Sequence, residues 1–150
     1  MDSFSRTMLA AAAESGLATI TLSRHVPNLR RNVRGNDKVV LLAKCLGSDG
    51  LGSGNYILML THNRMVVTRE SPRLGRVRPC IDQAIDALSG VRWSADPVRP
   101  GMEIAFQAVG EHFRFWINAG HEKQIWRIDA LLARKFRRPG AIRGGLVGLV

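Results

Sequence analysis

Residues 55–70 read NYILMLTHNRMVVTRE, two apolar runs joined by a short polar segment. Both runs are rich in aromatic or β-branched residues and contain no Gly or Pro, so each predicts a strand. His62 and Asn63 would form a two-residue loop between them, and Asn63 tolerates the positive φ that a tight hairpin turn needs. The pattern therefore predicts an antiparallel hairpin. The alternative is a buried helical hairpin, which the missing helix cap and the β-branched flanks disfavour.

A second feature of this hairpin is its motif. Residues 60–67, which follow the pattern L-T-x-x-R-M-V-V, resemble the L-T-x-x-R-L-V-V hairpin of bacterial pleckstrin-homology-like (PH-like) and GRAM-like domains. Residues 35–40, GNDKVV, resemble the L-x-x-G-E-x-V segment before the first strand of that family, with Asp37 and Lys38 in place of the usual Glu and its neighbour. The resemblance covers residues 33–138. It implies a seven-stranded barrel with a final helix, in which the hairpin supplies the second and third strands.

The fold that we expect is mainly β with α. It is a small PH-like β-barrel, or two packed antiparallel sheets, capped by a C-terminal helix and preceded by an N-terminal helix. The length of 150 residues fits one domain with short extensions. Residues 1–32 are predicted to be an N-terminal helical extension, residues 33–138 the PH-like domain and residues 139–150 a flexible apolar tail.

The N-terminal extension begins with a predicted helix over residues 3–15, which contain four consecutive alanines. Phe4 and Met8 share one face of this helix, but the face is small. We therefore expect the helix to pack in a groove or on a second copy of the chain, which would make a homo-oligomer. The alternative is a monomer in which the helix lies across an open face of the sheet. Residues 17–22 fit either a strand or a further helical turn.

Further expectations follow from short patterns along the chain. Pro27 is expected to begin a helical turn, because Pro suits the first helical position. The region near Val77 is expected to be an edge strand, because Pro79 cannot donate to a sheet ladder. Residues 81–88 fit a helix or a strand. The remaining expected strands are residues 39–44, 91–95, 102–109 and 112–118, the last two forming a hairpin around Gly110-Glu111.

The last predicted helix covers residues 122–137, with Asn118 as its N-cap. Its apolar stripe is expected to close one end of the barrel. The stripe consists of Ile125, Ile128, Leu132 and Phe136.

The charge balance is strongly basic, with 22 Lys and Arg against 12 Asp and Glu, a formal net charge of +10 and a pI of about 11.2. Such a balance favours polyanions or anionic membrane surfaces, and it also fits simple solubility. The two cysteines, Cys45 and Cys80, are expected to be reduced and half-buried, with a disulfide between them as the alternative. No typical signal peptide and no run of about 20 apolar residues is present, so we expect a cytoplasmic protein, with peripheral membrane association as one option.

Several chemistries lack support in the sequence. The glycines of residues 50–54 precede a strand rather than a helix, so a flexible connector is favoured over a nucleotide-binding loop. The histidines are not spaced as metal ligands, and no nucleophile elbow or carboxylate pair is visible. We therefore expect no enzyme activity, no cofactor and no metal.

The predicted function is a non-enzymatic PH-like binding or assembly module that engages an anionic membrane surface or a protein partner through a basic face. The resemblance implies that a lipid headgroup would lie near the loop after the first strand, although Asp49 and the lack of Lys or Arg in this loop depart from that pattern. The alternative is that these basic residues form a solvated surface that binds no ligand. The basic residues proposed for ligand binding are Lys44, Arg64, Arg69, Arg73, Arg76 and Arg78.

The alternative function is a basic nucleic-acid-binding protein, in which aromatic side chains would stack on bases. Trp93, Trp116 and Trp126 could do so, but all three lie in predicted strands or the last helix, where a core role is usual. Nucleic acid is therefore the less favoured partner.

Overall fold

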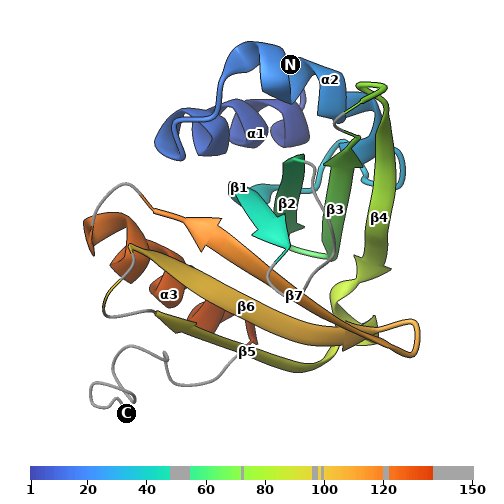
Figure 1. Cartoon of the computed structure of the whole chain (residues 1–150). Helices are drawn as coiled ribbons and strands as arrows, with labels where there is room; N and C mark the ends of the chain where they lie inside the picture. Colours follow the sequence, from blue (N-terminus) through green and yellow to red (C-terminus); the bar gives the residue numbers. More distant parts are fainter. Residues whose placement is uncertain (48–54, 72, 96–97, 99, 120–121, 137–150) are drawn as a thin grey trace.

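The computed structural model describes residues 1–47, 55–71, 73–95, 98, 100–119 and 122–136, which form a mainly β domain (Figure 1). The strands are β1 (Val39–Gly47), β2 (Asn55–Thr61), β3 (Arg64–Glu70), β4 (Val77–Ala84), β5 (Ser89–Ala95), β6 (Gly101–Ala108) and β7 (Glu111–Asn118). The helices are α1 (Ser3–Glu14), α2 (Thr19–Leu29), α3 (Glu122–Phe136) and the short 3-10 helix η1 (Ile85–Ala87). The glycine loop at residues 50–54 and the tail at residues 139–150 lie outside the described part of the chain.

The seven strands form one antiparallel sheet in the order β4-β3-β2-β1-β7-β6-β5. β1 joins its two halves, because residues 39–45 pair with β2 and residues 45–47 pair with β7. The short β1–β7 pairing lets the β5–β7 half cross the β1–β4 half at a steep angle (Figure 1). Within the described residues β4 and β5 do not pair with each other, so the expected closed barrel is wrong and the sheet is open. η1 connects these two edge strands instead of extending the ladder between them.

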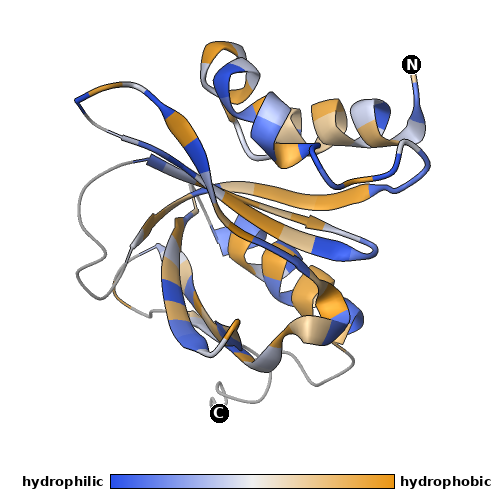
Figure 2. Cartoon of the chain, turned by 90° about the vertical axis from the view of Figure 1, so that its right-hand side faces the viewer, coloured by the Kyte–Doolittle hydropathy of each residue, from blue (hydrophilic) through white to orange (hydrophobic). Residues whose placement is uncertain are grey.

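The middle of the sheet is buried on both faces. On the inner face, which looks toward α3 and the other half of the sheet, Leu58 and Val67 belong to the larger core. On the outer face Ile57, Met59 and Val66 belong to a second core beneath α1 and α2 (Figure 2). Two-sided burial explains why β2 is a continuous apolar run, since neither set of alternate side chains reaches water.

The N-terminal helices supply the layer over the outer face. Phe4 and Met8 of α1 are buried there, together with Leu22 and Leu29 of α2. The helix therefore lies across the sheet of its own chain, as the monomeric alternative proposed. Of residues 17–22, which fit a strand or a helical turn, residues 19–22 form the first turn of α2. The turn expected to begin at Pro27 is wrong, because α2 has already started at Thr19 and Pro27 lies near its end, where it removes one backbone hydrogen bond.

A polar seam fixes α2 along the edge of the sheet. Three side chains spaced four residues apart lie on one side of the helix and just beyond its end. Arg24 forms an ion pair with Glu70 of β3, at 2.6 Å between Nη1 and Oε2. The Asn28 amide donates to the Val77 carbonyl at 3.1 Å, and the Asn32 amide donates to Asp82 at 2.7 Å.

His25 lies in the middle of this seam and is fully buried. Its Nδ1 is hydrogen-bonded to the Thr68 hydroxyl at 2.7 Å, while its Nε2 lies 3.4 Å from a carboxylate oxygen of Glu70 without forming a hydrogen bond. Burial lowers the pKa of His25 below its usual value; the Glu70 carboxylate opposes that shift in part, and Arg24 adds to it. The imidazole is therefore held neutral in the folded protein at neutral pH.

Helix α3 packs on the inner face through the predicted stripe, with Ile125, Ile128 and Leu132 buried. The Trp93 indole N–H donates to Asp129 at 2.8 Å, which joins α3 to β5. The expectation of three core tryptophans is wrong for Trp126, which is 44% exposed because it lies beside the stripe and not within it.

Other local expectations are resolved by the backbone. Asn118 is not the N-cap of α3, which starts four residues later; it ends β7, and its side chain accepts a hydrogen bond from the Trp116 indole at 3.0 Å. The β6–β7 turn is Val109-Gly110, both with positive φ, one residue earlier than expected.

β4 is an edge strand that contains Pro79, as predicted. Of residues 81–88, which fit a helix or a strand, residues 81–84 belong to β4 and residues 85–87 to η1, with Leu88 directly after it.

The two cysteines are both free thiols, so the alternative of a disulfide is not adopted. Cys45 is buried in the inner core, whereas Cys80 is exposed on β4, so the expectation of half-burial holds for neither. Cys80 lies at an irregularity in the β3–β4 pairing, where Val67 pairs with Ile81 and Thr68 with Pro79. The extra residue turns its side chain out of the regular alternation.

The buried neutral His25 predicts acid sensitivity. Its pKa is lower in the folded than in the unfolded chain, so the unfolded chain binds more protons once the pH falls below about 6.5. The free energy of unfolding should therefore fall between pH 7 and pH 5. In His25→Gln, which keeps a side chain able to hydrogen-bond to Thr68, this fall should be smaller. Urea unfolding at several pH values measures this fall. If the free energy of unfolding depends on pH in the same way in both proteins, His25 is not the group that makes the fold sensitive to acid.

Candidate functional site

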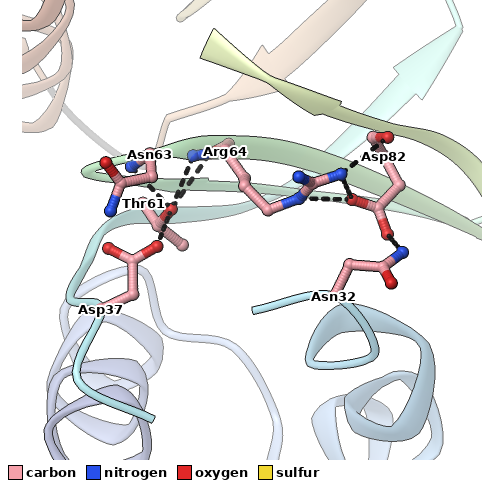
Figure 3. Close-up of polar contacts among 6 residues, drawn as sticks. All are labelled: Asn32, Asp37, Thr61, Asn63, Arg64 and Asp82. Carbon is pink, nitrogen blue, oxygen red and sulfur yellow. Dashed lines mark hydrogen bonds and ion pairs between the residues drawn. The ribbon is translucent and has the colours of Figure 1, made fainter. Parts of the chain in front are cut away.

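The residues that carry the family resemblance meet at the β2–β3 turn (Figure 3). The Thr61 hydroxyl donates to the buried carboxylate of Asp37 at 2.8 Å. It also accepts from the backbone N–H groups of Asn63 at 3.1 Å and Arg64 at 2.9 Å. One hydroxyl therefore closes the turn and ties it to the segment that leads into β1.

This arrangement corrects the expected turn geometry. The loop is His62-Asn63, as predicted, but Asn63 does not adopt positive φ; among the described non-glycine residues Val109 alone does. The Thr61 side chain satisfies the backbone N–H groups, so the turn does not depend on a left-handed residue.

Arg64 is also committed to this cluster. Its Nε and Nη2 lie 2.8 and 2.7 Å from Asp82 Oδ1, and Nη2 also donates to the Asp82 carbonyl at 3.1 Å (Figure 3). The other Asp82 oxygen accepts from Asn32. A fork-shaped guanidinium bound to a carboxylate in this way fixes the end of β4 against β3. Arg64 thus serves the fold, and it lies at the opposite end of β3 from the other predicted arginines.

Lys44 is separated from those arginines too. It lies two residues after Leu42 on β1, so both side chains are on the outer face of the sheet, and Lys44 is exposed there. It borders a pocket of about 310 Å³ between the α1–α2 junction and the sheet, which Ser15, Thr21, Asn118 and Gln124 also line.

The remaining four predicted residues gather at the β3–β4 hairpin. Arg69 and Arg78 are direct cross-strand partners, so their side chains share the inner face. The Arg69 guanidinium lies 5.9 Å from the centre of the Tyr56 ring. Arg73 and Arg76 are exposed in the connection, which is held by hydrogen bonds from Ser71 N–H to the Arg76 carbonyl at 2.9 Å and from Gly75 N–H to the Ser71 carbonyl at 3.1 Å. We call Arg69, Arg73, Arg76 and Arg78 the hairpin arginines.

Leu74 at the tip of this hairpin is a feature that the sequence reading missed. It is 72% exposed and stands between Arg73 and Arg76. No acidic residue occurs in residues 71–81. Glu70 at the base of the hairpin is paired with Arg24 and so is not free to neutralise the tip. The tip of the hairpin therefore presents an exposed apolar side chain between two exposed arginines.

Among the described residues, no group of three or more His, Cys, Asp and Glu side chains is placed to hold a metal ion. None of the described helices is both long and apolar enough to cross a bilayer. Comparison of the chain with protein-family models and with curated proteins gave no match.

The role of Thr61 predicts a large effect from an almost isosteric change. Thr61→Val removes one partner of the buried Asp37 and the acceptor for two backbone N–H groups. The free energy of unfolding should fall by about 2–4 kcal/mol, because each buried polar group left without a partner costs about 1–3 kcal/mol. Thr19→Val at the exposed start of α2 is the matched control, with an expected change below about 0.5 kcal/mol. Urea unfolding checks both, and equal stabilities would remove Thr61 from its assigned role.

Proposed function

We propose that the chain is a non-enzymatic PH-like binding module that attaches to anionic membrane surfaces through its β3–β4 hairpin. The strand order, the steep crossing of the two half-sheets and the final helix support the PH-like assignment (Figure 1). The hydrogen bonds that join Thr61 to Asp37 and to Arg64 also support it. They connect the two segments that resemble the family, residues 35–40 and 60–67, at one turn.

The observation that carries the membrane proposal is Leu74 at the hairpin tip, 72% exposed between Arg73 and Arg76. At a bilayer surface an apolar side chain gains by entering the boundary between headgroups and acyl chains, while neighbouring cations stay at the level of the lipid phosphates. The hairpin arginines would supply both long-range attraction and charge-assisted hydrogen bonds. A nucleic acid backbone offers the charge but no apolar region that a single protruding leucine could enter.

Vesicle sedimentation tests this proposal. The intact chain should bind vesicles that contain an anionic phospholipid and should bind neutral phosphatidylcholine vesicles weakly, with the difference shrinking as salt is raised. Arg73→Gln/Arg76→Gln should weaken partitioning by about 2 kcal/mol, roughly 30-fold, since each arginine near such a surface contributes about 1 kcal/mol. Leu74→Ser should weaken it by several-fold without changing the charge.

The control is a charge-matched double variant elsewhere, Arg31→Gln/Arg134→Gln, with exposed positions beyond α2 and on α3. It loses the same two charges and should retain most of the binding. Equal losses in the two double variants would show that net charge alone acts, and the hairpin would then have no special role. Binding to neither kind of vesicle would reject the membrane proposal and leave a protein partner to be sought.

The exposed Trp126 favours single-stranded nucleic acid as a second candidate. Lys123, Arg127 and Arg134 lie on the same exposed side of α3, and Arg127 is paired with Glu14 at 2.5 Å. An aromatic ring among cations can stack on a base while the cations contact phosphate. A gel-shift assay with single-stranded DNA and RNA across salt tests it. A shift that Trp126→Ala abolishes supports this candidate, and no shift at low salt rejects it.

A further inference from the structure

The β5–β7 half of the sheet has an outer face that neither N-terminal helix covers, because α1 packs on β1 and α2 on β3 and β4. A pocket of about 330 Å³ lies there. Its polar lining comes from Arg92 of β5, Gln107 of β6, and His112 and Arg114 of β7. This volume is at the small end of the range for small-molecule sites.

An irregularity in β5 creates the pocket. Ser89 pairs with Gln107 and Arg92 pairs with Ala105, so two residues of β5 oppose one residue of β6. Gly90 lies in this bulge with a φ of +59°, a conformation that glycine adopts readily. Strict alternation from Ser89 would have placed Val91 outside and Arg92 in the core. The extra residue reverses this, so Val91 is buried and Arg92 is exposed on the outer face.

The strand register then aligns two cations across a small residue. Ala105 pairs with Arg92 on one side and Arg114 on the other, so the three side chains form a row across the sheet. Two inter-strand spacings place the arginine Cα atoms roughly 10 Å apart. Ala105 has only a methyl group, which leaves room for the pocket between the two long side chains, although Ala105 itself is only 6% exposed.

The charges around this gap are not balanced. Arg114 Nε lies 3.7 Å from Glu103, a long ion pair between side chains that are 44% and 35% exposed. Within the described part of the chain, the side chain of Arg92 has neither a hydrogen bond nor an ion pair. The Gln107 amide lies 3.4 Å from His112 at one end of the pocket, which places a further polar group beside the gap.

We propose that this pocket binds the phosphate group of a small molecule, held between the guanidinium groups of Arg92 and Arg114 above Ala105. Planar guanidinium groups bind phosphate oxygens in pairs, and two of them facing one gap match a doubly charged, tetrahedral anion. The site is separate from the β3–β4 hairpin, and it does not rest on the membrane proposal.

Backbone NMR with inorganic phosphate as the probe tests the site on the intact chain. Phosphate should shift the amide signals of Ala105, Gln107 and Arg114 and saturate, whereas chloride at equal ionic strength should not. Arg92→Gln or Arg114→Gln should weaken the affinity at least tenfold. Arg31→Gln, at an exposed position beyond α2, is the control and should leave the affinity unchanged. Phenyl phosphate, a small phosphomonoester, should shift the same amides.

Ala105→Leu separates the pocket from mere positive charge. It keeps both arginines but fills the gap between them, so phosphate shifts at these positions should disappear. Unchanged phosphate binding in Ala105→Leu would overturn the proposal, as would shifts that chloride reproduces. Loss of binding in Arg73→Gln with no loss in Arg92→Gln would also overturn it, since the anion would then bind at the hairpin.

Discussion

The burial of the central strands on both faces is the constraint on which the rest of the structure depends. Leu42, Ile57, Met59 and Val66 on the outer face are each fully buried, and so are Leu58, Leu60, Met65 and Val67 on the inner face. A sheet of this composition cannot leave either face in water, because each exposed side chain of this size would forgo about 1.5–3 kcal/mol of burial. The layer formed by α1 and α2 is therefore part of the domain rather than an appendage to it.

The two layers divide the described surface into separate regions. The inner side is closed by α3, and the outer side of β1–β4 by α1 and α2. Among the described residues, these layers leave uncovered the β3–β4 hairpin, the outer face of β5–β7 and the exposed side of α3. The basic residues of the chain are consequently split among separate surfaces: the hairpin arginines form one, Arg92 and Arg114 another, and Lys44 lies apart from both.

The sequence predicted the features that local pattern determines. The His62-Asn63 loop, the strand at β5, the β6–β7 hairpin and the stripe on α3 all follow from period-2 or period-3.6 spacing and are confirmed. Features decided by tertiary contacts were missed. Asn63 does not need positive φ, because the Thr61 hydroxyl accepts the backbone N–H groups of the turn. Arg64 is not part of the basic face, because it is paired with Asp82 on the neighbouring strand. Sequence spacing alone contains neither fact.

The same limit applies to the sites. The arginines of residues 69–78 were found as a group because they are close in sequence, and the hairpin keeps them together. Arg92 and Arg114 were not found, because 22 residues separate them and the bulge at Gly90 reverses the alternation that would have been used to place Arg92. Trp126 was assigned to the core because it lies in the last helix, but it lies beside the stripe from Ile125 to Leu132 and is 44% exposed.

Deletion of residues 1–16, followed by amide hydrogen exchange and light scattering, tests the two-sided core most directly. Without α1 the outer face of β1–β3 loses the side chains of Phe4 and Met8 that cover it. We expect the amides of Ile57 and Met59 to lose most of their protection and the shortened chain to unfold or associate. A shortened chain that stays monomeric at high concentration, with these amides as protected as in the full chain, would contradict the account.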